Sequence, residues 1–86
     1  MTPDTAPTGE LRRAVDLALG GDWQAAHAIV QEYEGDARAA WIHAVVHRME
    51  GDLANARYWY GQCGRALPPD VSTADELRQI QAELAR

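Results

Sequence analysis

The sequence predicts an all-α fold of about five helices, built as two antiparallel helical hairpins and a C-terminal capping helix. Apolar residues recur at helical spacing along most of the chain, and glycine–aspartate pairs separate the apolar segments. The segment GDWQAA at 21–26 returns thirty residues later as GDLANA at 51–56. A fixed period of this size is typical of stacked helical units, each too small to bury its own apolar face.

The length and composition indicate one globular domain. The chain has 86 residues, of which 47% are hydrophobic, enough for a core in a single small domain. Residues 1–8 contain Pro3 and Pro7 and are predicted to form a flexible N-terminal segment. The helical domain is therefore expected over residues 9–86.

The charge and the cysteine content exclude several classes of function. A net charge of −5 argues against binding to nucleic acid and to anionic membrane surfaces, which both require a basic patch. No apolar run reaches the ~20 residues of a membrane span. The single cysteine, Cys63, fits a reducing cytoplasm, and the use of arginine without lysine, together with abundant alanine, is typical of a GC-rich bacterial genome. We therefore expect a cytoplasmic bacterial protein.

The first hairpin is predicted over residues 9–35. Its first helix runs from about Gly9 to Leu19 and ends at the glycine pair 20–21, since glycine adopts the left-handed C′ conformation at little cost. Asp22 then caps a second helix that reaches about Tyr33. The apolar stripes of the two helices are Leu11, Val15, Ala18 and Leu19, followed by Trp23, Ala26, Ile29, Val30 and Tyr33.

The second hairpin is predicted over residues 36–64. Asp36 caps a helix at 37–50 that is apolar around most of its circumference, so we expect it to be the central, buried element. Gly51 and Asp52 repeat the signal that ends one helix and caps the next. The following helix, at about 53–63, is expected to bury Leu53, Ala56, Tyr60, Cys63 and part of Trp59.

The last helix is predicted over residues 72–85, after the chain is broken at the proline pair 68–69. Ser72 and Thr73 are expected to open this helix, with Glu76 completing a capping box to Thr73. Its apolar positions are Leu77, Ile80 and Leu84. Because it is the most charged of the helices, we expect it to cap the stack.

The second hairpin resembles a tetratricopeptide repeat. The resemblance covers residues 37–69, and the matching positions are Trp41, Gly51-Asp52, Ala56, Tyr60 and Pro68. It implies paired antiparallel helices, although the period here is 30 residues rather than the usual ~34. The motif HAxxHRxEGDxxNAxYWY, at 43–60, also resembles a motif of small uncharacterised microbial proteins and implies no activity.

A group of histidines supplies the one candidate metal site. His43, His47 and Glu50 lie at positions i, i+4 and i+7, which places them along one side of the third helix. His27, on the preceding helix, completes the set if the two helices pack through these faces. Three imidazoles and a carboxylate suit zinc or another divalent metal. The alternative is that these are neutral structural histidines, each with a backbone hydrogen-bond partner.

The fourth helix supplies a candidate partner-binding surface. Successive helical residues point ~100° apart, so Tyr58, Trp59 and Tyr60 cannot all face the core. Tyr58 is expected to be exposed, and a tyrosine beside arginine and amide side chains is typical of protein contact surfaces. The predicted partner-binding residues are Tyr58, Arg57, Asn55 and Gln62.

These observations lead to two functional hypotheses. The leading one is a non-enzymatic interaction module without a cofactor, which binds a protein or peptide partner or forms a homo-oligomer, because two hairpins leave stack ends uncovered. The alternative is a small metal- or ligand-binding protein, extending to a metal-dependent enzyme, centred on His27, His43, His47 and Glu50. A third interpretation makes the histidines a pH-sensitive packing element. No catalytic residue is assigned.

Overall fold

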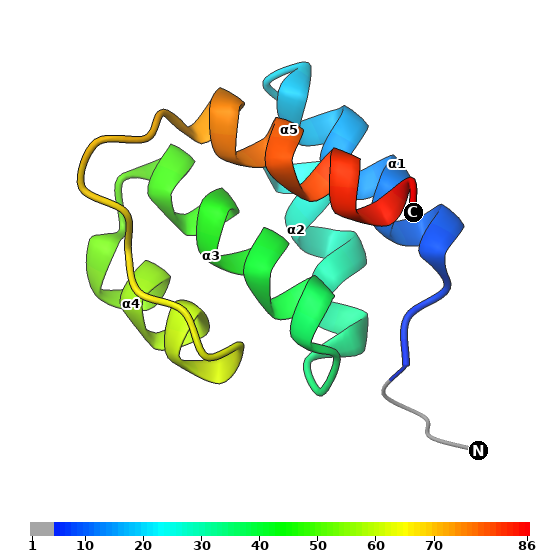
Figure 1. The fold of residues 1–86 in the computed structure, drawn as a ribbon, viewed down its shortest axis with the longest axis horizontal. Helices are drawn as coiled ribbons and strands as arrows, with labels where there is room; N and C mark the ends of the chain where they lie inside the picture. Colours follow the sequence, from blue (N-terminus) through cyan, green and yellow to red (C-terminus); the bar gives the residue numbers. More distant parts are fainter. Residues whose placement is uncertain (1–4) are drawn as a thin grey trace.

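The computed structural model describes residues 5–86, and this part of the chain is all-α, as predicted (Figure 1). It contains five α-helices and one short 3-10 helix. Their bounds are α1 Thr8–Leu19, α2 Trp23–Val30, η1 Gln31–Tyr33, α3 Ala37–Glu50, α4 Leu53–Gln62 and α5 Thr73–Leu84.

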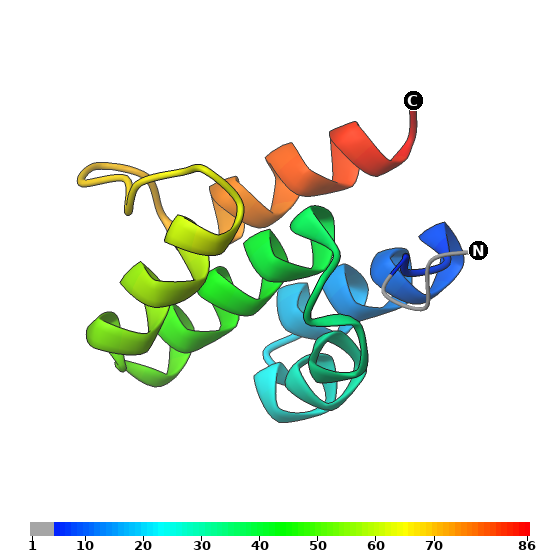
Figure 2. The ribbon, with the colours of Figure 1, turned by 90° about the horizontal axis from the view of Figure 1, so that it is seen from below.

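The central helix is α3, which packs against α1, α2, α4 and α5. In the first hairpin α1 packs on α2, and in the second α3 packs on α4. Helix α5 crosses over α1 and α3, whereas α4 lies at one end of the molecule, packs mainly on α3 and meets α5 through a hydrogen bond from Tyr60 to Glu76 (Figures 1 and 2). Nine residues of α3, from Ala39 to His47, are buried. This burial explains why the helix is apolar around most of its circumference.

The glycine–aspartate repeat works as the sequence predicts. Gly21 and Gly51 both have positive φ, at 90° and 87°, a conformation that side chains with a Cβ rarely adopt. The carboxylates of Asp22 and Asp52 then each accept a hydrogen bond from the N–H three residues later, at 3.1 and 3.2 Å. The two hairpins therefore begin their second helices in the same way.

The second helix is shorter than predicted. Its α-helical part ends at Val30, and residues 31–33 form a 3-10 helix before the chain turns at Gly35. A tighter last turn is common at helix ends because its i→i+3 bonds satisfy some of the terminal carbonyl groups.

One expectation about the core and one about helix capping are wrong. Leu53 is 45% exposed rather than buried, because it begins α4 at the end of the molecule, where no helix beyond α3 covers it. The capping box of the last helix is also absent: Ser72, not Thr73, is the N-cap, and its hydroxyl accepts a hydrogen bond from the N–H of Asp75 at 3.0 Å.

Glu76 instead turns into the core and joins three helices. Its carboxylate is only 5% exposed. It accepts hydrogen bonds from the indole of Trp41 at 2.8 Å and the hydroxyl of Tyr60 at 2.5 Å. It also forms an ion pair with Arg48 at 2.6 Å. The Glu76 carboxylate therefore binds side chains of α3 and α4 instead of capping its own helix. These contacts connect α5 to α3 and α4.

The N-terminal segment predicted over residues 1–8 lies partly outside the described residues. Within them, Ala6 is 2% exposed and donates its N–H to the carboxylate of Asp36 at 2.8 Å. Its carbonyl accepts a hydrogen bond from Arg38 at 2.8 Å. The chain just before α1 is thus attached to the start of α3.

None of the helices in the described part of the chain combines the length and apolarity that a membrane crossing requires.

Candidate metal centre

The structure brings the three histidines of the chain together. His43 and His47 lie one turn apart on α3, and His27 reaches them from α2, which packs on α3. The ring centroid of His27 lies 4.7 Å from that of His43 and 5.3 Å from that of His47, and the His43 and His47 centroids are 5.0 Å apart. Helices α2 and α3 therefore pack through the faces that carry the histidines, which is the arrangement required for His27 to join His43 and His47.

The spacing of the ring nitrogens is close to what a metal ion requires. One nitrogen from each ring can be chosen so that all three lie within 4.8 Å of one another. In a tetrahedral zinc site with bonds of about 2.0 to 2.1 Å, two ligand nitrogens are about 3.3 Å apart. Each pair therefore has to approach by about 1.5 Å at most, a movement within reach of small side-chain rotations.

Two of the three rings have no hydrogen-bond partner among residues 5–86. No hydrogen bond within the described residues involves a ring nitrogen of His27 or His43. Their nitrogens are also not sealed, since this part of the chain contains no fully buried side-chain nitrogen or oxygen that lacks a partner. The lone pairs of both rings are consequently available to a ligand that enters from solvent.

His43 lies deepest in the cluster. Its side chain is buried, with 3% exposed, and its ring stacks on Trp59 of α4 with centroids 3.9 Å apart and planes 12° apart. Burial, followed by the proximity of His27 and His47, lowers the pKa of His43 to about 3. The ring is therefore neutral near pH 7, the form in which imidazole binds metals.

His27 is half-buried and closer to the surface. Burial and the neighbouring His47 lower the pKa of His27, while the carboxylates of Glu50 and Glu34 act in the opposite direction. These causes favour a neutral ring here as well. Burial and the neighbouring imidazoles thus lower the pKa of both His27 and His43 and favour neutral rings at these two positions.

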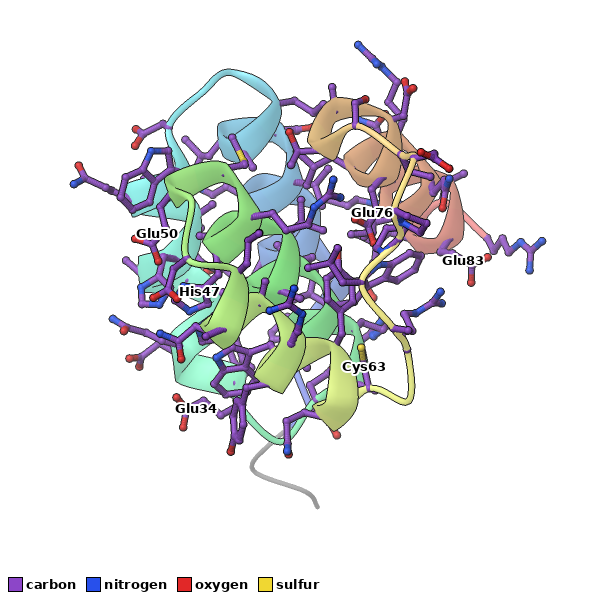
Figure 3. All side chains as sticks on the ribbon, turned by 90° about the vertical axis from the view of Figure 1, so that its left-hand side faces the viewer. Glu34, His47, Glu50, Cys63, Glu76 and Glu83 are labelled. Atoms are coloured by element: carbon purple, nitrogen blue, oxygen red, sulfur yellow. The ribbon has the colours of Figure 1, made fainter. Side chains whose placement is uncertain are left out.

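Glu50 does not join the three imidazoles but lies on the other side of His47. Its Oε1 contacts Nδ1 of His47 in an ion-pair geometry, so Nε2 is the nitrogen of His47 left for a metal (Figure 3). Carboxylates commonly hold the second nitrogen of a metal-binding histidine in this way and fix its tautomer. Glu50 is therefore not in the group of three imidazoles but forms a second group with His47 and Asp52, and its role as a ligand stays a prediction.

Two neighbours of the cluster were missed from the sequence. Asp52, interpreted as a helix cap, also lies near Glu50 and His47, and these three offer ligand atoms within 4.8 Å of one another. Trp59 is partly buried against the core, as expected, and it also stacks on His43. This stack joins residues of different helices and has no local sequence signal, whereas Asp52 follows Glu50 by only two residues.

The predicted partner-binding residues lie on α4. Tyr58 is 57% exposed, and Arg57, Asn55 and Gln62 are exposed as well. The side-chain amide of Asn55 donates to Asp52 at 2.7 Å. The four residues are thus accessible, as expected, and their binding of a partner remains a prediction.

Comparison of the chain with protein-family models, curated proteins and solved structures finds no match. The resemblance to tetratricopeptide repeats and to the microbial motif therefore remains an expectation from the sequence.

Proposed function

We propose that this protein binds one divalent transition-metal ion between His27, His43 and His47. The observation that supports this most strongly is that three imidazoles converge while His27 and His43 lack hydrogen-bond partners among the described residues. A structural histidine in the interior usually satisfies its ring nitrogens with protein groups or ordered water. Two adjacent rings that have no partner among the described residues keep nitrogen lone pairs open to a metal ion.

The donor set favours metals of intermediate softness. Neutral imidazoles suit zinc, copper, nickel and cobalt, whereas magnesium and calcium prefer oxygen ligands. The only cysteine of the chain, Cys63, lies at the C-terminal end of α4 and is not among the clustered residues. Zinc is therefore the simplest expected ion, bound through nitrogen alone on the protein side.

Isothermal titration calorimetry of purified, tag-free protein with zinc tests the proposal. We expect one zinc ion per chain, and His27→Gln should weaken binding by at least about tenfold, because it removes one of three ligands. His27 is the suitable position because it is half-buried and its loss disturbs the core least.

The matched control is Glu32→Gln, an exposed acidic residue on η1. The chain contains three histidines, all in the cluster, so no other histidine can substitute for them. Equal zinc affinity in the wild type and His27→Gln, with both folded by circular dichroism, would show that the cluster is not the site.

A second candidate function is protein binding through the outer side of α4. Leu53 and Tyr58 are the large hydrophobic residues of the described chain that are most exposed, at 45% and 57%, and both lie on a helix that packs mainly on α3. Sedimentation of the wild type and of Tyr58→Ala tests self-association. A monomer at every concentration, unchanged by the substitution, would contradict self-association through this side.

A further inference from the structure

Among the described residues, the proposed metal site has three ligands and no fourth. Within residues 5–86, no cysteine, aspartate or glutamate joins the group of His27, His43 and His47 at ligand distance. The nearest carboxylate on α3, that of Glu50, is engaged by His47. A tetrahedral ion held here would therefore need a ligand from outside the protein.

The two remaining acidic neighbours are placed for other roles. Asp52 caps α4 and accepts two hydrogen bonds from Asn55, from its backbone N–H at 3.2 Å and its side-chain amide at 2.7 Å. Glu34 is exposed and precedes the turn into α3. Figure 3 shows Glu34 well apart from the contact between His47 and Glu50. Asp52 could become the fourth ligand only if it no longer capped α4. Glu34 could do so only if the turn before α3 rearranged.

Water can reach the open position. The ring nitrogens of His27 and His43 are not sealed from solvent, and His27 is only half-buried. A fourth ligand that exchanges with solvent is the arrangement of catalytic zinc sites, whereas structural sites are closed by four protein ligands.

The charge of the ligands decides what the bound water can do. Three neutral imidazoles leave the full +2 charge on the ion, and such an ion lowers the pKa of its bound water from 15.7 to about 7. Thiolate or carboxylate ligands would neutralise part of this charge. Near neutral pH, a large fraction of the bound water would then be hydroxide.

We propose that the zinc-loaded site hydrolyses small activated carbonyl compounds, a proposal that rests on the metal binding proposed above. The bound water releases a proton to buffer, and the hydroxide attacks the carbonyl carbon. In an ester, the carbon–oxygen bond to the leaving group breaks, the leaving oxygen takes up the proton of the new carboxylic acid, and the carboxylate and alcohol depart. A new water molecule then fills the open position, so no oxidant or reductant is needed.

Hydrolysis of p-nitrophenyl acetate by zinc-loaded and zinc-free samples of the same preparation tests this inference. We expect the zinc-loaded protein to be faster by at least about tenfold, with a rate that rises through an apparent pKa of about 7. Azide should inhibit it by occupying the open position. Zinc content is measured on each sample, so that occupancy and activity are determined together.

Two controls separate the metal-bound hydroxide from other nucleophiles. The zinc-free protein reports the activity of the imidazoles themselves, and Cys63→Ser removes the one thiol, which is partly buried with a raised pKa. We expect Cys63→Ser to retain the zinc-dependent rate. If that rate disappears with the thiol, the inference is wrong.

The outcomes distinguish this inference from the proposed function. One zinc ion per chain, with the rate of the zinc-free protein and no effect of azide, would overturn the hydrolytic inference and leave metal binding intact. Absence of bound zinc after loading would overturn both. An azide-sensitive, zinc-dependent rate that His27→Gln abolishes would support both.

Discussion

The imidazole of His43 lies face to face with the indole of Trp59, with the ring centroids 3.9 Å apart. This stack joins the histidine cluster to α4, and Trp59 in turn contacts the exposed Tyr58 edge to face at 5.1 Å. A cation bound to His43 would draw electron density from its ring and strengthen the attraction to the indole face. Trp59 is therefore both a packing residue and a built-in reporter for the site.

The stack predicts that copper(II) quenches the fluorescence of Trp59. The wild type should lose a large part of its tryptophan emission on addition of one equivalent of copper(II). Trp59→Phe keeps an aromatic ring against His43 but should lose the part of this quenching that comes from Trp59, while Trp23 and Trp41 still emit. Equal quenching in both proteins would place copper away from His43.

The histidine cluster predicts that the metal-free protein loses stability in mild acid. The folded state holds His43 neutral, with its pKa lowered from 6.5 to about 3, so below pH 6.5 the unfolded chain binds more protons. The stability that depends on a neutral His43 is fully present above pH 6.5 and is lost progressively as the pH falls toward 3. From about pH 7 to about pH 5, His43 alone should account for about 2 kcal/mol.

Urea denaturation at the two pH values measures this loss. His27, with its pKa lowered by burial and by His47, acts in the same direction, while Glu50 and Glu34 oppose it. His43→Leu removes the titrating ring and should flatten the dependence. A wild type equally stable at both pH values would contradict the burial of neutral histidines.

The buried carboxylate of Glu76 predicts a large loss of stability on truncation. Glu76→Ala leaves Arg48 without its ion-pair partner in the interior and should cost about 3 to 5 kcal/mol. Glu76→Gln keeps the shape and part of the hydrogen bonding, so it should cost less. Glu83→Gln, on the exposed side of the same helix, should change the free energy of unfolding by no more than about 0.5 kcal/mol.

Chemical denaturation of these three variants ranks them. If Glu76→Ala were as stable as Glu83→Gln, the connection of α5 to α3 and α4 through Glu76 would contribute nothing to the fold.

Two glycines predict opposite effects of the same substitution. Gly51 has φ of 87°, so Gly51→Ala should destabilise the protein by about 1 kcal/mol. Gly61 lies within α4, where an added Cβ meets nothing within 4 Å, so Gly61→Ala should stabilise it by about 0.5 to 1 kcal/mol. Thermal melts of the pair measure both signs, and a stabilising Gly51→Ala would refute the turn geometry.

The fold was predictable from the sequence where its causes are local. The pairs at Gly21-Asp22 and Gly51-Asp52 combine a positive-φ residue with a cap, and both signals act within a single turn. Glu76 was mispredicted because its partners lie 16 to 35 residues away and no local rule includes them. The exposure of Leu53 could not be predicted either, because it depends on the absence of a neighbouring helix at that end of the described chain.

The candidate site was predictable in part. Helical periodicity places His43 and His47 on one side of a helix, whereas the approach of His27 depends on how α2 packs on α3. The choice of Glu50 between ligand and positioning residue depends on its rotamer, which the sequence does not specify. The cytoplasmic location and the partner remain predictions.

X-ray absorption of the zinc-loaded, tag-free protein tests the central claim most directly. Three imidazole nitrogens and one exchangeable oxygen, at about 2.0 to 2.1 Å from zinc, are the ligands we predict. The imidazole contribution should fall in His27→Gln. A zinc ion surrounded by carboxylate and water oxygens, without imidazole, would contradict metal binding by His27, His43 and His47.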